Sequence, residues 1–213
     1  MPSSARKRSL LTPRSYLSWS QLSTLETSEE QYVEKYVFGR AATSTDPMEF
    51  GKAVAEGLEK DDSGDAQIET LRLTLPHYRK HEFEVSAAFN GVPLLSKFDL
   101  YDPCPACRIG EVKTGVQPWN QARVDNHGQL VFYNLAHFAK YGRIAKETRL
   151  FWAQTQYGTD GLFLTGRLET FPAEITLDQV LLFAARRIQP AWKLILEISR
   201  KYQTQIKKNH ESK

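Results

Sequence analysis

The feature that most restricts how this chain can fold is an alternation of apolar and polar residues that begins near residue 82. From Phe83 to Phe89 every second residue is apolar and those between are acidic or small, which is the pattern of a strand with one buried face. Asn90-Gly91 follows, and this pair favours a tight hairpin turn. After it come a strand over 92–101, a turn over 102–107 with two prolines and a strand over 109–114. The segment therefore predicts a three-stranded meander.

Helical periodicity is found on both sides of this meander. Ser18 or Ser20 can cap a helix that ends near Gly39. Asp46-Pro47 predicts an N-cap followed by a proline at the first helical position. The remaining expected elements are an amphipathic helix that ends at Gly142, strands over 148–157 and 162–171, and a long final helix from residue 177 that kinks or breaks at Pro190.

Composition sets the class of protein. With 213 residues, of which 41% are hydrophobic and 25% charged, the chain is typical of one soluble folded domain. It has no run of about 18 uncharged apolar residues, so a membrane-spanning helix is not expected. Its basic start lacks the long apolar core of a signal peptide, so secretion is not expected either. We therefore expect a cytoplasmic protein.

The basic excess of the chain lies at its two ends. Residues 1–14 contain four basic residues and no acid, and residues 200–213 contain five against Glu211. Because the formal net charge of the whole chain is only +3, the part between these ends is acidic. Basic ends suit a polyanionic partner, or serve only to keep the protein in solution. The expected organisation is a flexible basic arm over 1–16, a single folded domain over 17–200 and a basic tail over 201–213.

Two carboxylates and a lysine fall on neighbouring strands of the meander. Glu111 and Lys113 are two residues apart and project from one face, while Val112 projects to the other. If Asp99 pairs near Glu111, three charged groups meet at one end of the sheet, where burial is costly unless the charge is compensated. Mg²⁺ or Mn²⁺ is a natural partner, because it binds carboxylate oxygens and backbone carbonyls such as that of Val112.

These three charged residues have a catalytic and a structural interpretation. A bound metal would lower the pKa of its water, and Lys113 could orient that water and neutralise charge in the transition state. Alternatively, Asp99, Glu111 and Lys113 form an ordinary surface ladder of salt bridges across a hairpin. Taken alone, the residues leave both interpretations open.

A family pattern favours the catalytic interpretation. Asp99, a gap and then Glu111-Val112-Lys113 resemble the signature of the PD-(D/E)xK nuclease superfamily. The similarity to the RecB-like branch of that superfamily extends to four further segments: residues 90–99 resemble its G-x-P-L-x-G-x-x-D strand, residues 113–115 its K-T-G continuation, Gln129 and Tyr133 its Q-x-x-x-Y helix, and residues 50–59 its F-G-x-x-x-H-x-x-L-E helix. The ordered motifs lie within residues 17–140.

The resemblance implies a fold and an activity. The fold is an α/β (α+β) fold of the restriction-endonuclease type, with an αβββαβ core, a mixed sheet flanked by helices, and extra N- and C-terminal helices. The activity is Mg²⁺- or Mn²⁺-dependent hydrolysis of phosphodiester bonds in DNA, with Asp99 and Glu111 as metal ligands and Lys113 positioning water. Gln129 and Tyr133 share a helix face and would act on the substrate or support the metal ligands. Alternatively, Tyr133 only packs in the core and Gln129 is solvated.

Three positions depart from the family pattern. Ala55 stands where many members have a metal-binding histidine, Phe98 replaces the proline before the aspartate, and Ser96 replaces a glycine. Glu56 or Glu49 could replace the histidine only if the helix were rotated.

Two acidic residues of the first strand are further candidate ligands. Glu84 matches an acidic position of phage-type exonucleases, and Glu82 points the same way. Either could bind metal directly or through water. The alternative is an exposed strand carboxylate.

Cys104 and Cys107 form a single C-x-x-C in the turn between the second and third strands. Relatives with an iron–sulfur cluster use four cysteines, so no such cluster is expected. The pair is interpreted as a hairpin turn without chemistry, or as part of a zinc site completed by histidines or a second subunit.

Several side chains are candidates for binding DNA. Trp119 lies with Arg123 and His127 between the lysine strand and the following helix, where a nucleic-acid strand could pass. Its indole could stack on a base or pack beneath the loop. Arg123, Lys140 and Arg143 could bind phosphates, which would make binding sensitive to salt.

The favoured interpretation is a RecB-like exonuclease that acts on linear single- or double-stranded DNA in DNA repair or recombination. The setting would be a bacterial cytoplasm, or the host cytoplasm for a phage protein, with no membrane involved. A recombinase, a single-strand annealing protein or a helicase is the expected partner, since 213 residues leave no room for a motor domain. An endonuclease would use the same residues. So would a nucleic-acid-binding scaffold without turnover, which Ala55 and Phe98 favour.

Overall fold

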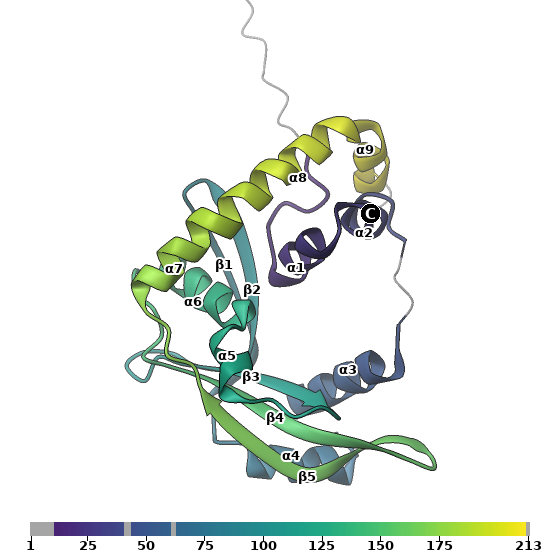
Figure 1. Ribbon diagram of the computed structural model, residues 1–213, viewed down its shortest axis with the longest axis vertical. Helices are drawn as coiled ribbons and strands as arrows, with labels where there is room; N and C mark the ends of the chain where they lie inside the picture. The colour runs from purple at the N-terminus through teal and green to yellow at the C-terminus, as the bar shows by residue number, and fades with distance from the viewer. Residues whose placement is uncertain (1–10, 41–43, 61–62, 212–213) are drawn as a thin grey trace, which may run out of the picture.

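The computed structural model describes residues 11–40, 44–60 and 63–211. Its strands are β1 (Lys80–Phe89), β2 (Val92–Asp102), β3 (Arg108–Gly115), β4 (Glu147–Gly158) and β5 (Gly161–Pro172). They form one sheet in the order β1-β2-β3-β4-β5, in which the β3–β4 pair is parallel and the other pairs are antiparallel (Figure 1). The predicted meander and the later strand pair are both present in this mixed sheet.

The hairpin between β1 and β2 turns at the predicted pair. Asn90 and Gly91 have φ values of 47° and 79°, in the left-handed region that this turn requires. Phe89 and Val92 pair directly on either side of it. The turn chemistry therefore fixes the register of the two strands.

The β2–β3 ladder stops just before the charged residues. Leu100 pairs with Gly110, and the paired stretch continues from there towards the turn. Asp99 and Glu111 are the next residues on each strand, so they lie where β2 and β3 separate. This separation leaves room for side chains between the two strands.

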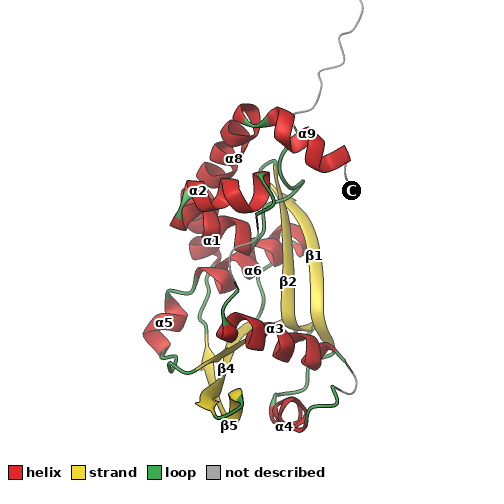
Figure 2. Ribbon diagram, turned by 90° about the vertical axis from the view of Figure 1, so that its right-hand side faces the viewer, coloured by secondary structure: helices red, strands yellow, loops and turns green. Residues whose placement is uncertain are grey.

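Helices cover both faces of the sheet (Figure 2). On β4, Leu150 and Trp152 are buried in one core and Phe151 and Ala153 in another, because successive strand side chains point to opposite faces. The larger core packs against α1 (Trp19–Thr27), α6 (Gly128–Tyr141), α7 (Leu177–Phe183) and α8 (Gln189–Lys201), and the smaller core against α3 (Asp46–Glu59) and α4 (Ala66–Thr74).

The predicted N-terminal helix is interrupted in the structure. Ser18 caps α1, with its Oγ accepting the N–H of Gln21 at 3.4 Å. Ser28 then adopts an extended backbone and caps a second helix, α2 (Glu29–Tyr32), which continues as a π-helical turn over Val33–Val37. A serine side chain that accepts local N–H groups competes with helix continuation, so the single helix expected up to Gly39 is corrected to two.

The second predicted helix, α3, is present, and two short helices that were not predicted follow it along the chain. α3 has Pro47 in its first turn as expected, but its N-cap is Thr45 rather than Asp46. α4 and α5 (Gln121–Asp125) are additional to the predicted elements. Such short helices contain too few turns to produce a clear apolar period.

The C-terminal helix is interrupted near its proline, as predicted. Thr176 and Gln179 form a capping box at the start of α7. Residues Ala184–Ile188 form a π-helical turn, and α8 begins at Gln189, next to Pro190. Because Pro190 has no N–H to donate, a regular helix cannot pass through this point unchanged.

The ends of the chain are partly packed on the domain. The expected basic tail contains helix α9 (Gln203–Glu211), whose Ile206 is buried and whose Asn209 donates from Nδ2 to the carbonyl of Val37 at 2.6 Å. Most of the expected N-terminal arm, residues 1–10, lies outside the described residues. Within the described ranges, no helix has the length and apolar character needed to cross a membrane.

Candidate active site

β3 presents two of the predicted catalytic side chains on one face. Glu111 and Lys113 form an ion pair, while Val112 packs against the smaller core on the other face. Glu111 is 1% exposed, so its charge depends on protein partners rather than on solvent. Burial alone would lower the pKa of Lys113, but the carboxylates of Glu111 and Asp99 raise it. The ammonium therefore stays charged.

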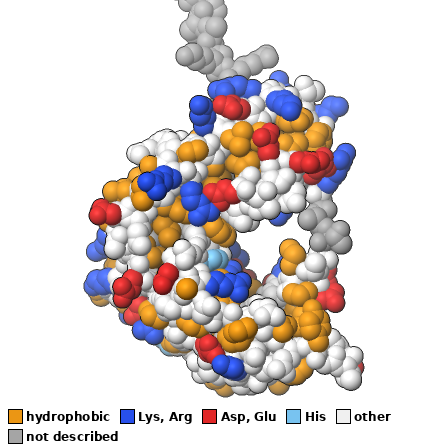
Figure 3. Space-filling model, in the orientation of Figure 1, with side chains coloured by type: hydrophobic (Ala, Val, Ile, Leu, Met, Phe, Trp, Pro, Cys, Tyr) orange, Lys and Arg blue, Asp and Glu red, His pale blue; other side chains and the backbone are white. Residues whose placement is uncertain are grey.

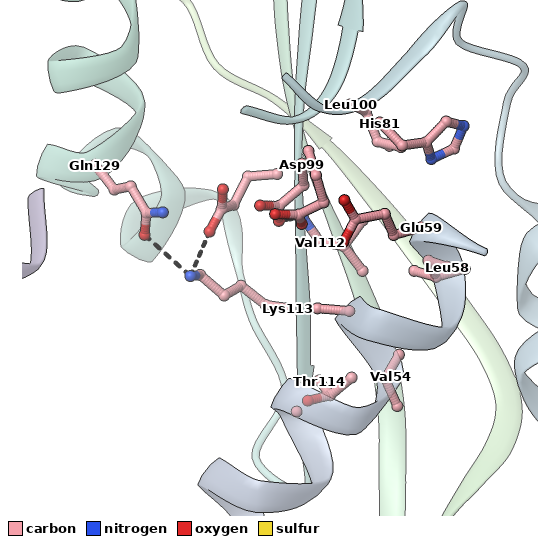
Figure 4. Close-up of a pocket in the computed structure, with 14 residues that line it drawn as sticks. Val54, Leu58, Glu59, His81, Asp99, Leu100, Val112, Lys113, Thr114 and Gln129 are labelled. Atoms are coloured by element: carbon pink, nitrogen blue, oxygen red, sulfur yellow. Dashed lines mark hydrogen bonds and ion pairs between the residues drawn. The ribbon is translucent and has the colours of Figure 1, made fainter. Parts of the chain in front are cut away.

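Helix α6 completes the surroundings of this ion pair (Figure 4). Tyr133 donates from its hydroxyl to Oε2 of Glu111 at 2.6 Å. Gln129 donates from Nε2 to the Tyr133 hydroxyl at 2.8 Å, and its Oε1 accepts from Lys113 Nζ at 3.0 Å. Together with the ion pair these bonds close a ring of four side chains, which we call the β3–α6 ring.

Asp99 lies beside the β3–α6 ring, on β2. Its Oδ2 accepts the backbone N–H of Val112 at 2.8 Å, which fixes the carboxylate between the two separating strands. Burial, followed by the nearby charge of Glu111, raises the pKa of Asp99 well above its usual range. Two carboxylates held this close need a positive charge near both of them.

These residues line a cavity of about 330 Å³ between the sheet and α3. Asp99, Glu111 and Lys113 form one side of it, and α3 contributes Ala55 and Glu59 to the other. α3 can approach β3 closely because it has glycine at position 51: a Cβ added there would lie 3.1 Å from Thr114 Oγ1. The glycine of the F-G motif thus has a packing role.

Of the two acidic candidates on β1, Glu82 lies at the cavity and Glu84 does not. Glu82 lines the cavity and pairs with Lys97 at 2.6 Å. Glu84 is exposed and does not line the cavity. The reason is local: Glu82 has φ 48°, in the left-handed region, and the ladder between β1 and β2 skips this residue. Regular alternation, which would place Glu82 and Glu84 on the same face, does not hold there.

α3 places alanine, rather than an acid, at the position of the family's histidine. Ala55 lines the cavity, whereas Glu56 is exposed and pairs with Lys52 at 3.5 Å on the outer side of the helix. Glu49 is also exposed. Glu59 does line the cavity, and sequence reasoning missed it, although it is the last residue of the F-G helix motif.

Phe98, another departure from the family pattern, packs against Tyr133 of the β3–α6 ring. It is fully buried, and its ring centroid lies 5.0 Å from that of Tyr133 and 5.5 Å from that of Tyr101. An aromatic residue at this position supports the tyrosine that donates to Glu111. The departure therefore does not disturb the site.

The expected DNA-binding residues are dispersed. Trp119 is buried, with the Arg123 guanidinium 3.9 Å from its ring centroid and His127 edge-on at 5.0 Å, so it packs beneath the loop. Burial and the charge of Lys113 lower the pKa of His127 to about 4. Lys140 and Arg143 are exposed at the other end of α6, and the structure does not bring them to the cavity.

The residues at the cavity fit a hard divalent cation. Asp99 and Glu111 offer carboxylate oxygens, and the charge of Glu111 adds to burial in raising the pKa of Asp99. Carboxylates, carbonyls and water are the ligands that Mg²⁺ and Mn²⁺ prefer. The donor set therefore agrees with the metal that the resemblance implies.

Comparison with known proteins confirms the fold. No protein-family model and no curated protein matches the chain. A crystal structure of a candidate exonuclease from Eubacterium rectale is similar with a TM-score of 0.51 at 12% identity, over 97% of this chain and 87% of that chain. An alkaline exonuclease from Laribacter hongkongensis gives 0.47 at 10% identity, over 89% and 94%. The predicted restriction-endonuclease-like α/β fold, with a mixed sheet flanked by helices, is confirmed.

Proposed function

We propose that this chain is a divalent-metal-dependent nuclease that hydrolyses phosphodiester bonds of DNA, as a RecB-like exonuclease of the PD-(D/E)xK type. The observation that carries the proposal is the closed β3–α6 ring beside Asp99 in a cavity. An ordinary surface ladder of salt bridges would not require side chains of α6 to form hydrogen bonds with both Glu111 and Lys113. The fold of the E. rectale structure supports the same conclusion.

Asp99 and Glu111 would hold the metal ion together with the backbone carbonyl of Val112. In a strand the N–H and C=O of one residue point the same way, and the N–H of Val112 points at Asp99. This direction supports the carbonyl as a third ligand. When bound, Mg²⁺ or Mn²⁺ supplies a water of lowered pKa and stabilises negative charge on the phosphate.

Lys113 would orient the attacking water and neutralise charge on the scissile phosphate. Its raised pKa keeps it as an ammonium, which has three donors and no lone pair, so it is suited to holding the water rather than to accepting a proton. Gln129 fixes one of these donors at 3.0 Å. Glu111 takes a second donor, and the third would face the substrate.

Tyr133 and Gln129 would hold the Glu111 carboxylate and the Lys113 ammonium in position. Burial raises the pKa of Tyr133, so its hydroxyl remains a donor to Glu111. That bond takes one oxygen of the Glu111 carboxylate and leaves the other for Lys113. Partners that orient a metal ligand in this way usually affect metal affinity or activity by about 10–100-fold.

DNA would approach through the hollowed face of the molecule. Figure 3 shows a hollow between the regions of α1 and α3, with basic and histidine side chains on its wall. Arg123, which is exposed on α5 just before α6, is the proposed phosphate ligand. A recombinase, a single-strand annealing protein or a helicase is the proposed partner in DNA repair or recombination.

Incubation of purified protein with three DNA substrates tests the proposal. Linear, circular single-stranded and supercoiled DNA are incubated with Mg²⁺ or Mn²⁺, with EDTA as the metal-free control. We expect linear DNA to be degraded only with metal, and Lys113→Ala to be inactive. Lys52→Ala, an exposed change on the outer side of α3, is the matched control.

Each of the other outcomes contradicts one part of the proposed function. No hydrolysis by the unchanged protein supports the scaffold alternative and rejects the enzyme. Hydrolysis that survives Lys113→Ala rejects the assignment of the site. Cutting of closed circles rejects a strict exonuclease in favour of the endonuclease alternative.

A further inference from the structure

The turn between β2 and β3 carries two cysteines beside a buried histidine from α6. Cys104 and Cys107 form a disulfide, with their Cα atoms 4.3 Å apart. Both sulfur atoms and a ring nitrogen of His137 lie within 4.8 Å of one another. Cys107 and His137 are fully buried and Cys104 is half-buried. This cluster lies away from the cavity of the proposed nuclease site, near the C-terminal end of α6.

His137 is oriented as a metal-binding histidine would be. Its Nδ1 lies 2.7 Å from the carbonyl oxygen of Arg143. Because a carbonyl can only accept, Nδ1 carries the proton and Nε2 keeps its lone pair. A ring nitrogen that donates to a carbonyl while the other binds metal is the usual arrangement in metal sites.

The lone pair of Nε2 has only a long hydrogen bond in this structure. The hydroxyl of Tyr101 lies 3.3 Å from it, beyond the usual length for a hydroxyl donor. A metal ion at the cysteine side could therefore take this lone pair at little cost, since Tyr101 can give up a weak bond.

The backbone of the turn is also fixed. The carbonyl of Cys107 accepts the N–H of Lys146 at 2.8 Å, just before β4, and Cys107 has φ 48°. The disulfide joins two residues of this same turn, only three apart, and so does not connect the turn to α6. A ligand shared with His137 would connect them.

We propose that Cys104, Cys107 and His137 bind one Zn²⁺ ion when the two cysteines are reduced. Thiolate and imidazole ligands select zinc over the hard cations that suit Asp99 and Glu111, and C-x-x-C is the spacing of zinc-binding turns. Cys104 is the half-buried ligand, so the fourth position of the tetrahedron opens to water on its side.

The disulfide and zinc forms are related by a balanced two-step conversion. A thiol or phosphine reductant supplies two electrons, two protons are taken up, and the S–S bond is replaced by two thiols. Zn²⁺ binding then displaces both thiol protons to solvent as the two Zn–S bonds form.

The zinc ion would hold α6 against the strands that carry the nuclease site. Gln129, Tyr133 and His137 are spaced four residues apart and lie along one face of α6. The cysteine turn leads directly into β3, which carries Glu111. A zinc ion between turn and helix would therefore fix the same β3–α6 alignment that the ring of hydrogen bonds requires.

Cobalt binding to the reduced full-length protein tests the proposal. The protein is reduced with a phosphine, two free thiols are verified with a thiol reagent, and Co²⁺ is added. We expect one equivalent to give strong tetrahedral absorption with thiolate-to-cobalt charge transfer, which Zn²⁺ then abolishes. A carboxylate site cannot give the charge-transfer band, so this readout is independent of the proposed nuclease metal.

Variants assign the ligands. Cys104→Ser and His137→Asn should each weaken zinc binding by more than the ~10–100-fold typical of losing an outer partner, while the exposed His77→Asn should not. Zn²⁺ should also raise the melting temperature of the reduced protein but not that of Cys104→Ser. Absence of the charge-transfer band in fully reduced protein overturns the site. If His137→Asn fails to fold, unchanged zinc affinity in Cys104→Ser still overturns it.

Discussion

The two walls of the cavity differ in how firmly their side chains are held. On the α6 wall, Gln129 and Tyr133 are hydrogen-bonded to the charged residues of β3. On the α3 wall, Ala55 offers no polar group and Glu59 is an exposed residue at the end of its helix. We infer that the chemistry is pre-organised by α6 and β3, and that α3 shapes the cavity and leaves one ligand position to be filled.

The largest expected effect is on the firmly held wall. Glu111→Gln keeps the shape of the side chain but removes the charge that would bind metal and pair with Lys113. We expect hydrolysis of linear DNA at saturating Mg²⁺ to fall by about 10³-fold, the order seen when one pre-organised electrostatic partner is removed. Initial rates measure it, with the exposed Glu56→Gln as control. Retention of a tenth of the rate would show that the β3–α6 ring is not the catalytic centre.

A smaller loss is expected at the tyrosine of the same wall. Tyr133→Phe deletes the donor at 2.6 Å from Glu111 and leaves the buried carboxylate with one partner fewer. We expect a loss of about 10–100-fold in metal affinity or rate, with a stability cost of about 1–3 kcal/mol. Metal titrations and denaturant unfolding measure the two effects. Tyr157→Phe, at an exposed tyrosine, is the control, and equal behaviour of the two variants would contradict the role of Tyr133.

On the α3 wall, by contrast, a substitution should strengthen metal binding. Ala55→His adds an imidazole where the cavity lacks a nitrogen ligand. We expect the Mn²⁺ concentration for half-maximal rate to fall by about tenfold, which corresponds to ~1.4 kcal/mol. The change should be smaller for Mg²⁺, because imidazole suits the softer ion better. If Ala55→His and the control Ala55→Ser titrate alike, α3 does not face the metal position.

The smallest expected effect is a gain in stability without metal. Asp99 has a raised pKa in the folded state, so ionising it at neutral pH destabilises the fold. Asp99→Asn keeps the acceptor for the Val112 N–H and removes the charge. We expect the metal-free variant to be about 1 kcal/mol more stable at pH 7, or ~3 °C in melting temperature, while losing activity.

The pH dependence gives this last prediction its sign. Between the usual carboxyl pKa and the raised one, the folded state holds a proton that the unfolded state has lost, so stability falls as pH rises. The advantage of Asp99→Asn should therefore shrink as the pH is lowered to about 4. Calorimetry in EDTA measures it. An advantage that grows towards acid would contradict the raised pKa.

The strands and α6 could be predicted because they follow simple periods, whereas the central residues were proposed from the family motifs. Glu111 and Lys113 share a face as a strand requires, and Gln129 and Tyr133 share a face as a helix requires. Sequence pattern named both Glu82 and Glu84 but could not decide between them, because it does not reveal the left-handed backbone of Glu82 that breaks the alternation. Nor could it decide whether Trp119 stacks on DNA or packs beneath its loop, since that depends on the tertiary contacts of Arg123.

Other differences arise where local and long-range interactions compete. Ser28 ends a helix that the apolar period alone would continue, because its side chain caps the next one. The tail beyond residue 201 forms a helix because Ile206 finds a buried position that composition does not reveal. The charge of this tail predicted exposure to solvent, but Ile206 and the hydrogen bond from Asn209 to Val37 hold its helix against the domain.

The parallel pairing of β3 with β4 has a consequence for how the protein is made. The β1–β2–β3 meander and the β4–β5 hairpin each form from neighbouring residues, whereas β3 and β4 are joined only across the α6 crossover. The strand with Glu111 and Lys113, β3, is thus where these two locally formed units pair. A chain emerging from the ribosome would therefore have all four members of the β3–α6 ring synthesised before β4, the strand that pairs with β3 along its whole length, is available.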